Sequence, residues 1–224
     1  MKITKYGKDV VLKMLIITIL IDLIAFLIPN VIIKIILFTF SILLFGFTLW
    51  FFRDPTRKLP SGINENTIIS PADGKVVLIE EIENKEDNLF KKGEKLKQVS
   101  IFLSPLNVHV NCHPVTGIVD YFKYIEGEYL VAFDHKSSER NERTEIGIKT
   151  INGNKILFKQ IAGFVARRIV CNLKTGDEVY IGEKFGMIKF GSRVDMLFDI
   201  NTKIFVKPGD KTKTGETIIG EFQS

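Results

Sequence analysis

Two apolar stretches near the N-terminus constrain the fold more than any other feature of this 224-residue chain. Residues 10–28 read VVLKMLIITILIDLIAFLI, and residues 35–52 read IILFTFSILLFGFTLWFF without a charged side chain. Runs of about 20 apolar residues are long enough to cross the hydrocarbon core of a bilayer as helices. Pro29 and Asn30 separate the runs as a tight turn would, so we predict a helical hairpin that anchors the chain to a membrane through residues 1–60.

Basic residues flank both open ends of the expected hairpin. They are Lys2, Lys5, Lys8 and Lys13 on one side and Arg53, Arg57 and Lys58 on the other. Because positive residues stay on the cytoplasmic side, we expect both ends and the following domain in the cytoplasm. The alternatives are a signal peptide for the first run, a buried core helix for the second, or a shallow interfacial hairpin, since Asp22 and Lys34 interrupt the apolar pattern.

The hydrophobic period changes to that of β-strands in residues 61–224. Runs such as KVVLIEEI (75–82), QVSIFL (98–103) and VDMLFDI (194–200) alternate apolar and polar residues between Gly, Asp, Asn and Pro turns. We therefore predict a mainly β domain, a sandwich or barrel-like fold, for residues 61–224. The charged segment HKSSERNERTE (135–145) is predicted to be a surface loop.

A ten-residue pattern occurs twice near the C-terminus. KTGDEVYIGE (174–183) and KPGDKTKTGE (207–216) share K-x-G-D-x-x-x-x-G-E. Paired glycines around a short strand are typical of hairpin turns with positive φ, and such units recur in lipoyl-like and biotinyl-like β folds. The alternative is two similar turns with no further relation.

Charge and cysteine content limit the classes of partner and cofactor. A net charge of +5 suits nucleic acid or an anionic membrane surface, and the apolar runs make us favour the membrane and expect no nucleic acid. The two cysteines, Cys112 and Cys171, form no CxxC pair and no zinc-like spacing with histidine. We expect reduced thiols and no metal.

The Gly191–Ser192 pair lies between two apolar strands in FGMIKFGSRVDMLFDI (185–200). At a sharp turn, a serine hydroxyl can attack the carbonyl carbon of the preceding residue, and glycine there has no Cβ to obstruct the attack. The amide becomes an ester, β-elimination breaks the ester, and loss of ammonia leaves an N-terminal pyruvoyl group. The reaction needs a base for the hydroxyl and donors for the oxyanion. An ordinary Gly-Ser turn is the alternative interpretation.

Five short stretches together resemble the phosphatidylserine decarboxylases of the short prokaryotic type. They occur in the same order over residues 51 to about 200 and are RDP (53–55), SPADGKV (70–76), IFLSPLNVHVNCHPVTG (101–117), NER (141–143) and KFGSRVD (189–195). The resemblance implies a proenzyme that cuts itself between Gly191 and Ser192, giving a β chain 1–191 and an α chain 192–224 that stay associated.

The same resemblance implies the reaction and its cofactor. The cofactor is a pyruvoyl group made from Ser192, which binds the serine amine of the lipid as a Schiff base and takes up electrons as CO2 leaves. The substrate is phosphatidylserine, an anionic phospholipid, and the product is phosphatidylethanolamine. An archaeal member would act on archaetidylserine, which carries the same headgroup.

The resemblance also implies roles for an aspartate and a histidine. Asp73 would join the charge relay for self-cleavage, although Asp-Gly is also a common type I′ turn. His109 matches the first of two family histidines and is expected to act as proton donor or base. Cys112 occupies the second histidine position and His113 is displaced by one, so the self-cleavage base stays open. His113 is either a second site residue or a surface histidine before Pro114.

Basic side chains are the candidates for contact with the lipid phosphate or the membrane surface. They are Arg53, Arg57, Lys58, Arg167 and Arg168, any of which can equally be an ordinary surface charge. His135, in the charged segment, is expected in solvent or near lipid headgroups.

Two functions of other classes compete with the decarboxylase. A non-enzymatic membrane adaptor with a lipoyl-like domain would explain the anchor and the repeated glycine turns, but it requires neither Gly191–Ser192 nor His109 and predicts a coiled-coil insertion that is absent. A membrane serine peptidase using Ser192 and His109 would be expected to show a GxSxG or SxxK motif, and the sequence contains neither.

Overall fold

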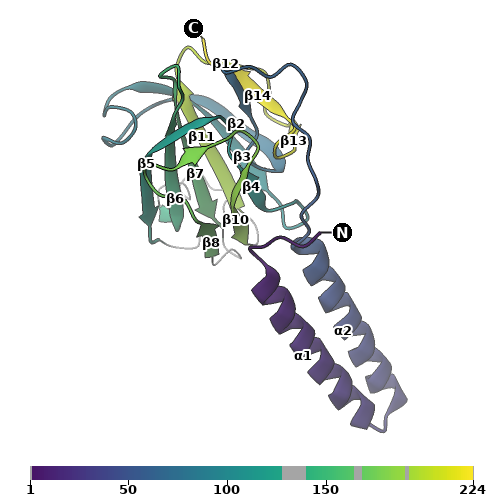
Figure 1. Ribbon diagram of the computed structural model, residues 1–224. Helices are drawn as coiled ribbons and strands as arrows, with labels where there is room; N and C mark the ends of the chain where they lie inside the picture. The colour runs from purple at the N-terminus through teal and green to yellow at the C-terminus, as the bar shows by residue number, and fades with distance from the viewer. Residues whose placement is uncertain (1, 128–139, 164–167, 190–191, 224) are drawn as a thin grey trace. The chain divides into compact units, whose positions relative to one another are not determined.

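The computed structural model describes residues 2–127, 140–163, 168–189 and 192–223. Contacts divide the chain into two compact units, one ending at Pro55 and one beginning at Thr56. The first unit is helical, and the second is built from strands (Figure 1).

The N-terminal unit is a hairpin of two antiparallel helices, α1 (Lys8–Leu27) and α2 (Val31–Phe51). Asn30 begins α2, because its Oδ1 accepts hydrogen bonds from the backbone N–H groups of Ile32 at 3.0 Å and Ile33 at 3.3 Å. Both helices are long and apolar enough to cross a membrane. The predicted helical hairpin is confirmed.

Small side chains line the contact between the two helices. Thr18 and Ala25 are buried on α1, and Ser41 and Thr48 are buried on α2. Ser41 Oγ donates to the Thr18 carbonyl oxygen at 3.4 Å. Small residues let two helices approach closely where no hydrophobic effect drives them together, as in a bilayer. Most of the large apolar side chains face outward, which suits a lipid-facing surface.

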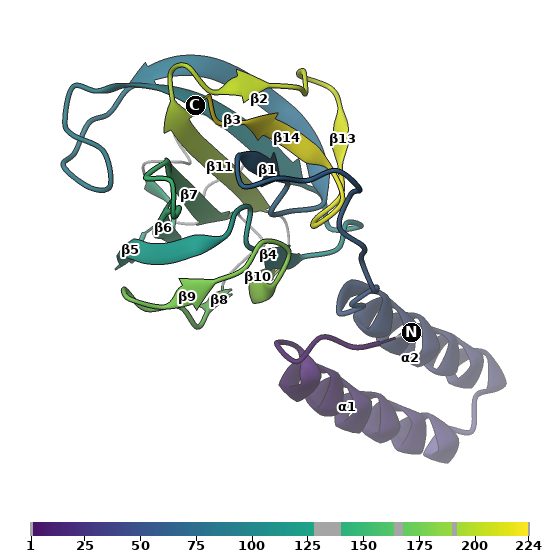
Figure 2. The same ribbon diagram turned by 45° about the horizontal axis from the view of Figure 1, so that its top comes forward.

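The second unit is mainly β and contains one large antiparallel sheet that curls into a half-barrel (Figure 2). Its strands, in spatial order, are β13 (Lys211–Thr212), β2 (Gly74–Glu83), β3 (Lys95–Leu103), β11 (Ser192–Asp199), β7 (Lys155–Ala162), β6 (Arg143–Lys149), β5 (Gly117–Ile125) and β9 (Glu178–Val179). The predicted mainly β domain is confirmed.

Two smaller sheets complete this unit. One has the order β4 (Val110–Cys112), β10 (Lys184–Lys189) and β8 (Arg168–Cys171), and the other β1 (Thr67–Ile69), β14 (Ile218–Glu221) and β12 (Lys203–Ile204). The hydrophobic core joins the three sheets. On β11 it takes Val194, Met196 and Phe198, whereas Arg193 and Asp195 form a buried ion pair on the other face. This alternation fixes the face on which Ser192 lies.

The repeated K-x-G-D-x-x-x-x-G-E pattern forms two equivalent pairs of tight turns, each around a short strand, β9 or β13. They are not the predicted hairpin turns, because β9 pairs with β5 and β13 with β2, and neither pairs with the strands before and after it. All four glycines have the predicted positive φ, at 94° and 81° for Gly176 and Gly182 and at 100° and 74° for Gly209 and Gly215. In each copy the Asp carboxylate accepts from the backbone N–H of the Lys three residues earlier, at 2.8 Å and 2.9 Å. The positive φ predicted for the glycines is therefore confirmed, whereas the hairpin pairing is not.

The repeat extends beyond the segment that the sequence reveals. Residues 70–76 lead into the start of β2 as residues 113–119 lead into the start of β5, and each start pairs with the short strand of one turn unit, β13 or β9. A Cβ on Gly74 would lie 2.4 Å from the Phe102 carbonyl oxygen, and one on Gly117 would lie 2.3 Å from the Lys149 carbonyl oxygen. Each glycine therefore lets two strands approach closely at the same place in the two copies.

The sequence predicts a surface loop for the charged segment 135–145, but part of this segment is buried. Residues 135–139 lie outside the described residues, but Asn141, Glu142, Thr144 and Glu145 are buried, and β6 begins at Arg143. Several of these polar side chains are paired within the domain. Glu145, for example, accepts from Arg143 Nε at 3.0 Å and lies 3.2 Å from Lys159 Nζ.

We predict that Gly74→Ala lowers the free energy of unfolding by about 1–3 kcal/mol, because the new methyl group would push β2 away from β3. Lys75→Ala is the control, since this exposed neighbour on the same strand should change stability by less than about 0.5 kcal/mol. Chemical unfolding of the full chain in detergent measures both. Equal stability of the two variants would contradict the close approach.

Candidate active site

Ser192 is the first residue of β11, the fourth strand of the eight-stranded sheet. It pairs with Leu103 of β3 and with Ala162 of β7. The residue is 0% exposed, and its Oγ has no hydrogen-bond partner among the described residues. Because a buried hydroxyl normally finds a partner, such an atom marks a candidate reactive group. Gly191 lies outside the described residues.

A row of residues crosses the sheet at the level of Ser192. Extending the register of β2 with β3 by one residue puts Gly74 opposite Leu103, and extending that of β6 with β7 puts Glu142 opposite Ala162. Ala162 N–H donates to the Glu142 carbonyl oxygen at 2.9 Å, which confirms the second extension. The row that contains Ser192 therefore includes Gly74, the residue after Asp73, on one side and Glu142 on the other.

His109 lies in the connection that follows β3, at the end of the sheet where Ser192 begins. The Ser104 backbone N–H donates to Asn107 Oδ1 at 2.9 Å, which shapes this connection. His109 is fully buried, and its Nδ1 is 2.9 Å from the Asn107 carbonyl oxygen. A carbonyl only accepts, so we assign the proton to Nδ1, and Nε2 is then the basic nitrogen. The Ile188 backbone N–H donates to the His109 carbonyl oxygen at 3.2 Å, which links this loop to β10.

Asp73 is held by a basic side chain and by the backbone. Its Oδ2 is 2.8 Å from Arg57 Nη2, and its Oδ1 accepts from the Thr214 N–H at 2.8 Å. Arg57 also contacts Glu216 at 3.5 Å. The alternative of a type I′ turn at Asp73–Gly74 is wrong, because Gly74 begins β2 without the positive φ that this turn requires.

Cys112 lies beside this cluster. Its Sγ donates to the Ser70 carbonyl oxygen at 3.4 Å and accepts from Thr214 Oγ1 at 3.1 Å. Burial raises the pKa of the Cys112 thiol to about 11, so the thiol is neutral at physiological pH. A neutral thiol is a poor base, and Cys112 therefore cannot replace the imidazole expected at its position.

His113 lies apart from His109. Three residues lie between them, and four steps of extended chain span about 13 Å. The His113 ring stacks against Phe185 with 4.9 Å between ring centroids, and its backbone N–H donates to the Glu183 carbonyl oxygen. Burial lowers the pKa of His113 to about 4. The structure thus gives His113 a packing role near the start of β10, whereas His109 is linked to Ile188 near its end.

Among the described residues, the remaining basic candidates have contacts or exposure of their own. Arg53 belongs to the helical unit and lies 4.0 Å from the centre of the Trp50 ring. Lys58 is exposed, and Arg168 is exposed at the start of β8. Arg57 binds Asp73, as described above. Arg167 and His135 lie outside the described residues.

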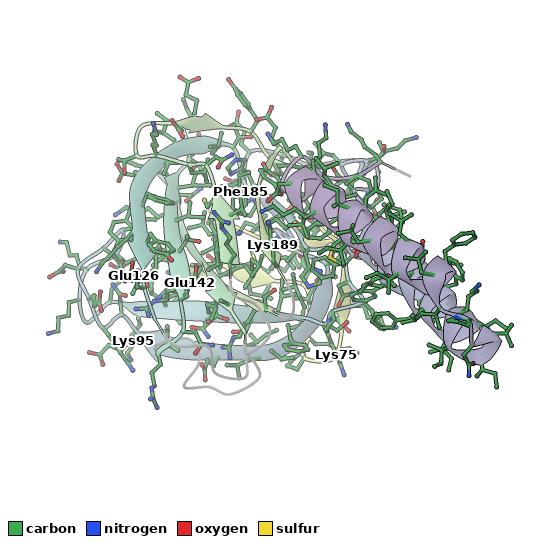
Figure 3. The ribbon with its side chains drawn as sticks, turned by 90° about the horizontal axis from the view of Figure 1, so that it is seen from below. Lys75, Lys95, Glu126, Glu142, Phe185 and Lys189 are labelled. Atoms are coloured by element: carbon green, nitrogen blue, oxygen red, sulfur yellow. The ribbon has the colours of Figure 1, made fainter. Side chains whose placement is uncertain are left out.

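Sequence reasoning missed Glu142 as a residue near Ser192. The NER motif (141–143) pointed to this segment, but its charges were interpreted as those of a solvated loop. Asn141 Nδ2 donates to the Ala162 carbonyl oxygen at 2.7 Å, so this motif holds the strand beside Ser192. Figure 3 labels Glu142 together with Phe185 and Lys189 of β10.

We predict that His113 makes the protein less stable as the pH falls from 6.5 to about 4. Over this range the unfolded chain, with its ordinary histidine pKa of 6.5, takes up a proton that the folded chain refuses. The loss amounts to roughly 3 kcal/mol and is absent above pH 6.5. His113→Phe keeps the aromatic contact but cannot titrate, so its unfolding free energy should fall less over the same range. Parallel curves for the two proteins would contradict the depressed pKa.

Comparison with known proteins finds similar sequences over most of the chain. The family model described as phosphatidylserine decarboxylase matches residues 44–220. The chain is 46% identical over 222 residues to a phosphatidylserine decarboxylase proenzyme of Chlorobium chlorochromatii, covering 98% of this chain and 100% of the relative. It is 46% identical over 221 residues to the proenzyme of Chlorobaculum tepidum (99% and 98% covered), and 50% identical over 184 residues to that of Amoebophilus asiaticus (82% and 79% covered).

Proposed function

Because the chain belongs to the phosphatidylserine decarboxylase family, we propose that it cuts itself between Gly191 and Ser192 and then removes the carboxyl group of phosphatidylserine to give phosphatidylethanolamine. The observation that carries this proposal is the buried Ser192 hydroxyl, which has no hydrogen-bond partner among the described residues. The relatives named above are bacterial, which favours phosphatidylserine over archaetidylserine. Their names favour an enzyme over the membrane adaptor and the peptidase.

Self-cleavage would convert Ser192 to a pyruvoyl group in three steps. Oγ bonds to the Gly191 carbonyl carbon, and the amide C–N bond breaks to leave an ester. Elimination of the Ser192 α-proton breaks the Cβ–O bond and releases a Gly191 carboxylate. The enamine that remains takes up water, loses ammonia and becomes the pyruvoyl group. Position supports this assignment, because Ser192 begins a strand and is hydrogen-bonded to strands on both sides.

His109 is our candidate for the proton transfers. Its Nδ1 hydrogen bond to Asn107 leaves Nε2 basic, and the residue is fully buried at the Ser192 end of the sheet. Asp73 supports the site as a negative charge next to Gly74 of the row, held in place by Arg57. Since Arg57 is already paired with Asp73, the exposed Lys58 is the better candidate for contact with anionic lipid.

A pyruvoyl group at Ser192 would supply a carbonyl that bonds to the lipid amine and withdraws electrons as CO2 leaves. The chain's own residues would bury this group between the large sheet and β10, where water is excluded. The same burial strengthens any interaction with a charge that develops there.

We propose that the helical hairpin α1–α2 anchors the enzyme where its lipid substrate resides, with the β domain in the cytoplasm. The support is the length and apolarity of the two helices and the basic residues at both open ends of the hairpin. After the cut, the α chain 192–224 would stay with the β chain 1–191, because β11 pairs with β3 and β7 from Ser192 to Phe198.

We predict that the purified protein consists of two chains, one of about 33 residues with a blocked N-terminus of pyruvoyl mass, whereas Ser192→Ala stays whole. Intact mass spectrometry and a denaturing gel measure this directly. A folded wild-type protein in a single uncut chain would sink the proposal of self-cleavage.

We predict that Cys112→Ser still cleaves itself at the wild-type rate, because the neutral Cys112 thiol does not act as the base. His109→Gln should lower the rate of cleavage, of decarboxylation or of both by about 100-fold or more. Cleavage is followed on a gel during synthesis, and decarboxylation by release of CO2. Loss of cleavage in a stably folded Cys112→Ser variant would contradict this prediction and assign the self-cleavage base to Cys112.

A further inference from the structure

We propose that Glu142 binds the ammonium group of the substrate's serine headgroup and accepts its proton, an inference that rests on the proposed decarboxylase function. The lipid amine must lose a proton before its lone pair can bond to a carbonyl carbon. In this step one N–H bond breaks, one O–H bond forms on the Glu142 carboxylate, and the electron pair stays on nitrogen.

The position of Glu142 carries the first part of the argument. It lies in the row Leu103–Ser192–Ala162–Glu142, two strands from Ser192, so about 9–10 Å separate the two Cα atoms. Side chains in one row project from the same face of a sheet. The only side chain of the row between Ser192 and Glu142 is the methyl group of Ala162, the smallest that a chiral residue can have.

Hydrogen bonds show that the Glu142 side chain points between the sheets. Its Oε1 accepts from the Ile169 backbone N–H of β8 at 3.4 Å and from Tyr124 Oη of β5 at 3.0 Å. Glu142 is 3% exposed, whereas Tyr124 is 50% exposed. The carboxylate therefore faces the interior on the Ser192 side of the sheet, close to a residue that reaches solvent.

The second carboxylate oxygen of Glu142 has no partner among the described residues. Oε2 is buried without a hydrogen-bond partner among the described residues, and no ion pair joins Glu142 to a basic side chain in that part of the chain. Burying a carboxylate without a cation costs several kcal/mol. Such a cost is typical of a residue kept for its function, and the serine ammonium is the cation that the proposed substrate brings.

The neighbouring row shows that the fold can satisfy polar groups at this depth. Thr144 Oγ1 donates to Gln160 Oε1 at 2.8 Å, and Gln160 Nε2 donates to Asn111 Oδ1 at 2.9 Å. Asn111 Nδ2 in turn donates to the Pro71 carbonyl oxygen at 3.1 Å. The row of Ser192, by contrast, contains two polar atoms without a hydrogen-bond partner among the described residues, Ser192 Oγ and Glu142 Oε2, and one ligand could meet both.

The test uses the full chain carrying Ser192→Ala in detergent, so that binding is measured without turnover. Two probes are compared by calorimetry: O-phospho-L-serine and 3-phosphoglycerate, which has a hydroxyl in place of the amine. We expect about a tenfold or greater preference for phosphoserine, the worth of one charge-assisted hydrogen bond, and we expect Glu142→Gln to abolish it. Glu145→Gln is the matched control, because this buried carboxylate lies on the other face and should leave the preference intact.

Folding and self-cleavage are read separately in chains that keep Ser192. Glu142→Gln should cleave itself like the wild type and then decarboxylate phosphatidylserine slowly. If Glu142→Gln does not fold, Tyr124→Phe replaces it, because loss of the hydroxyl that holds Oε1 should reduce the preference several-fold. Three outcomes would overturn the role of Glu142 in binding the ammonium group. They are an unchanged preference for phosphoserine in the folded variant, a Ser192→Ala parent that shows no preference, and a folded Glu142→Gln chain that stays uncut. An uncut wild type instead overturns the proposed function.

Discussion

The arrangement of the site depends on the pairing of β11 with strands on both sides. Every residue from Ser192 to Phe198 has a partner on β3 and another on β7, so the start of this strand cannot shift without disrupting the middle of the sheet. The alternation along β11 then separates an apolar inner face from a buried Arg193–Asp195 pair on the other face. Slipping the register by one residue would exchange these faces and bury a charge in the core, which makes the position of Ser192 unambiguous.

Polar groups in the interior fall into two classes. Those along Thr144, Gln160 and Asn111 saturate one another and hold β6, β7 and β4 together. In the row of Ser192, Ser192 Oγ and Glu142 Oε2 have no hydrogen-bond partner among the described residues. This row lies at the level where β3 leads into the His109 loop. A buried polar atom without a partner lowers stability, and two such atoms lie in the row of the residue proposed to react, beside a row whose polar side chains are paired.

The sequence predicted the elements with strong local signals. The helical hairpin followed from length and apolarity, the β domain from alternation, and the positive φ at Gly176 and Gly209 from the repeated turn pattern. It did not predict the burial of Glu142, because a charge-rich segment looks solvated until the partners Tyr124 and Ile169, distant in sequence, are known. For the same reason it could not show that Gly74 serves close strand contact or that His113 lies apart from His109.

The two copies of the turn unit differ in one respect that bears on Asp73. Thr116 Oγ1 accepts from the Ile181 N–H at 3.0 Å in the second copy, as Asp73 Oδ1 accepts from the Thr214 N–H in the first. A neutral hydroxyl thus suffices to close this corner, and the backbone does not need a carboxylate there. The second copy therefore serves as an uncharged comparison for Asp73, because Thr116 occupies the equivalent position there. Measured against that copy, the negative charge and its Arg57 partner are additions to the fold and not requirements of it.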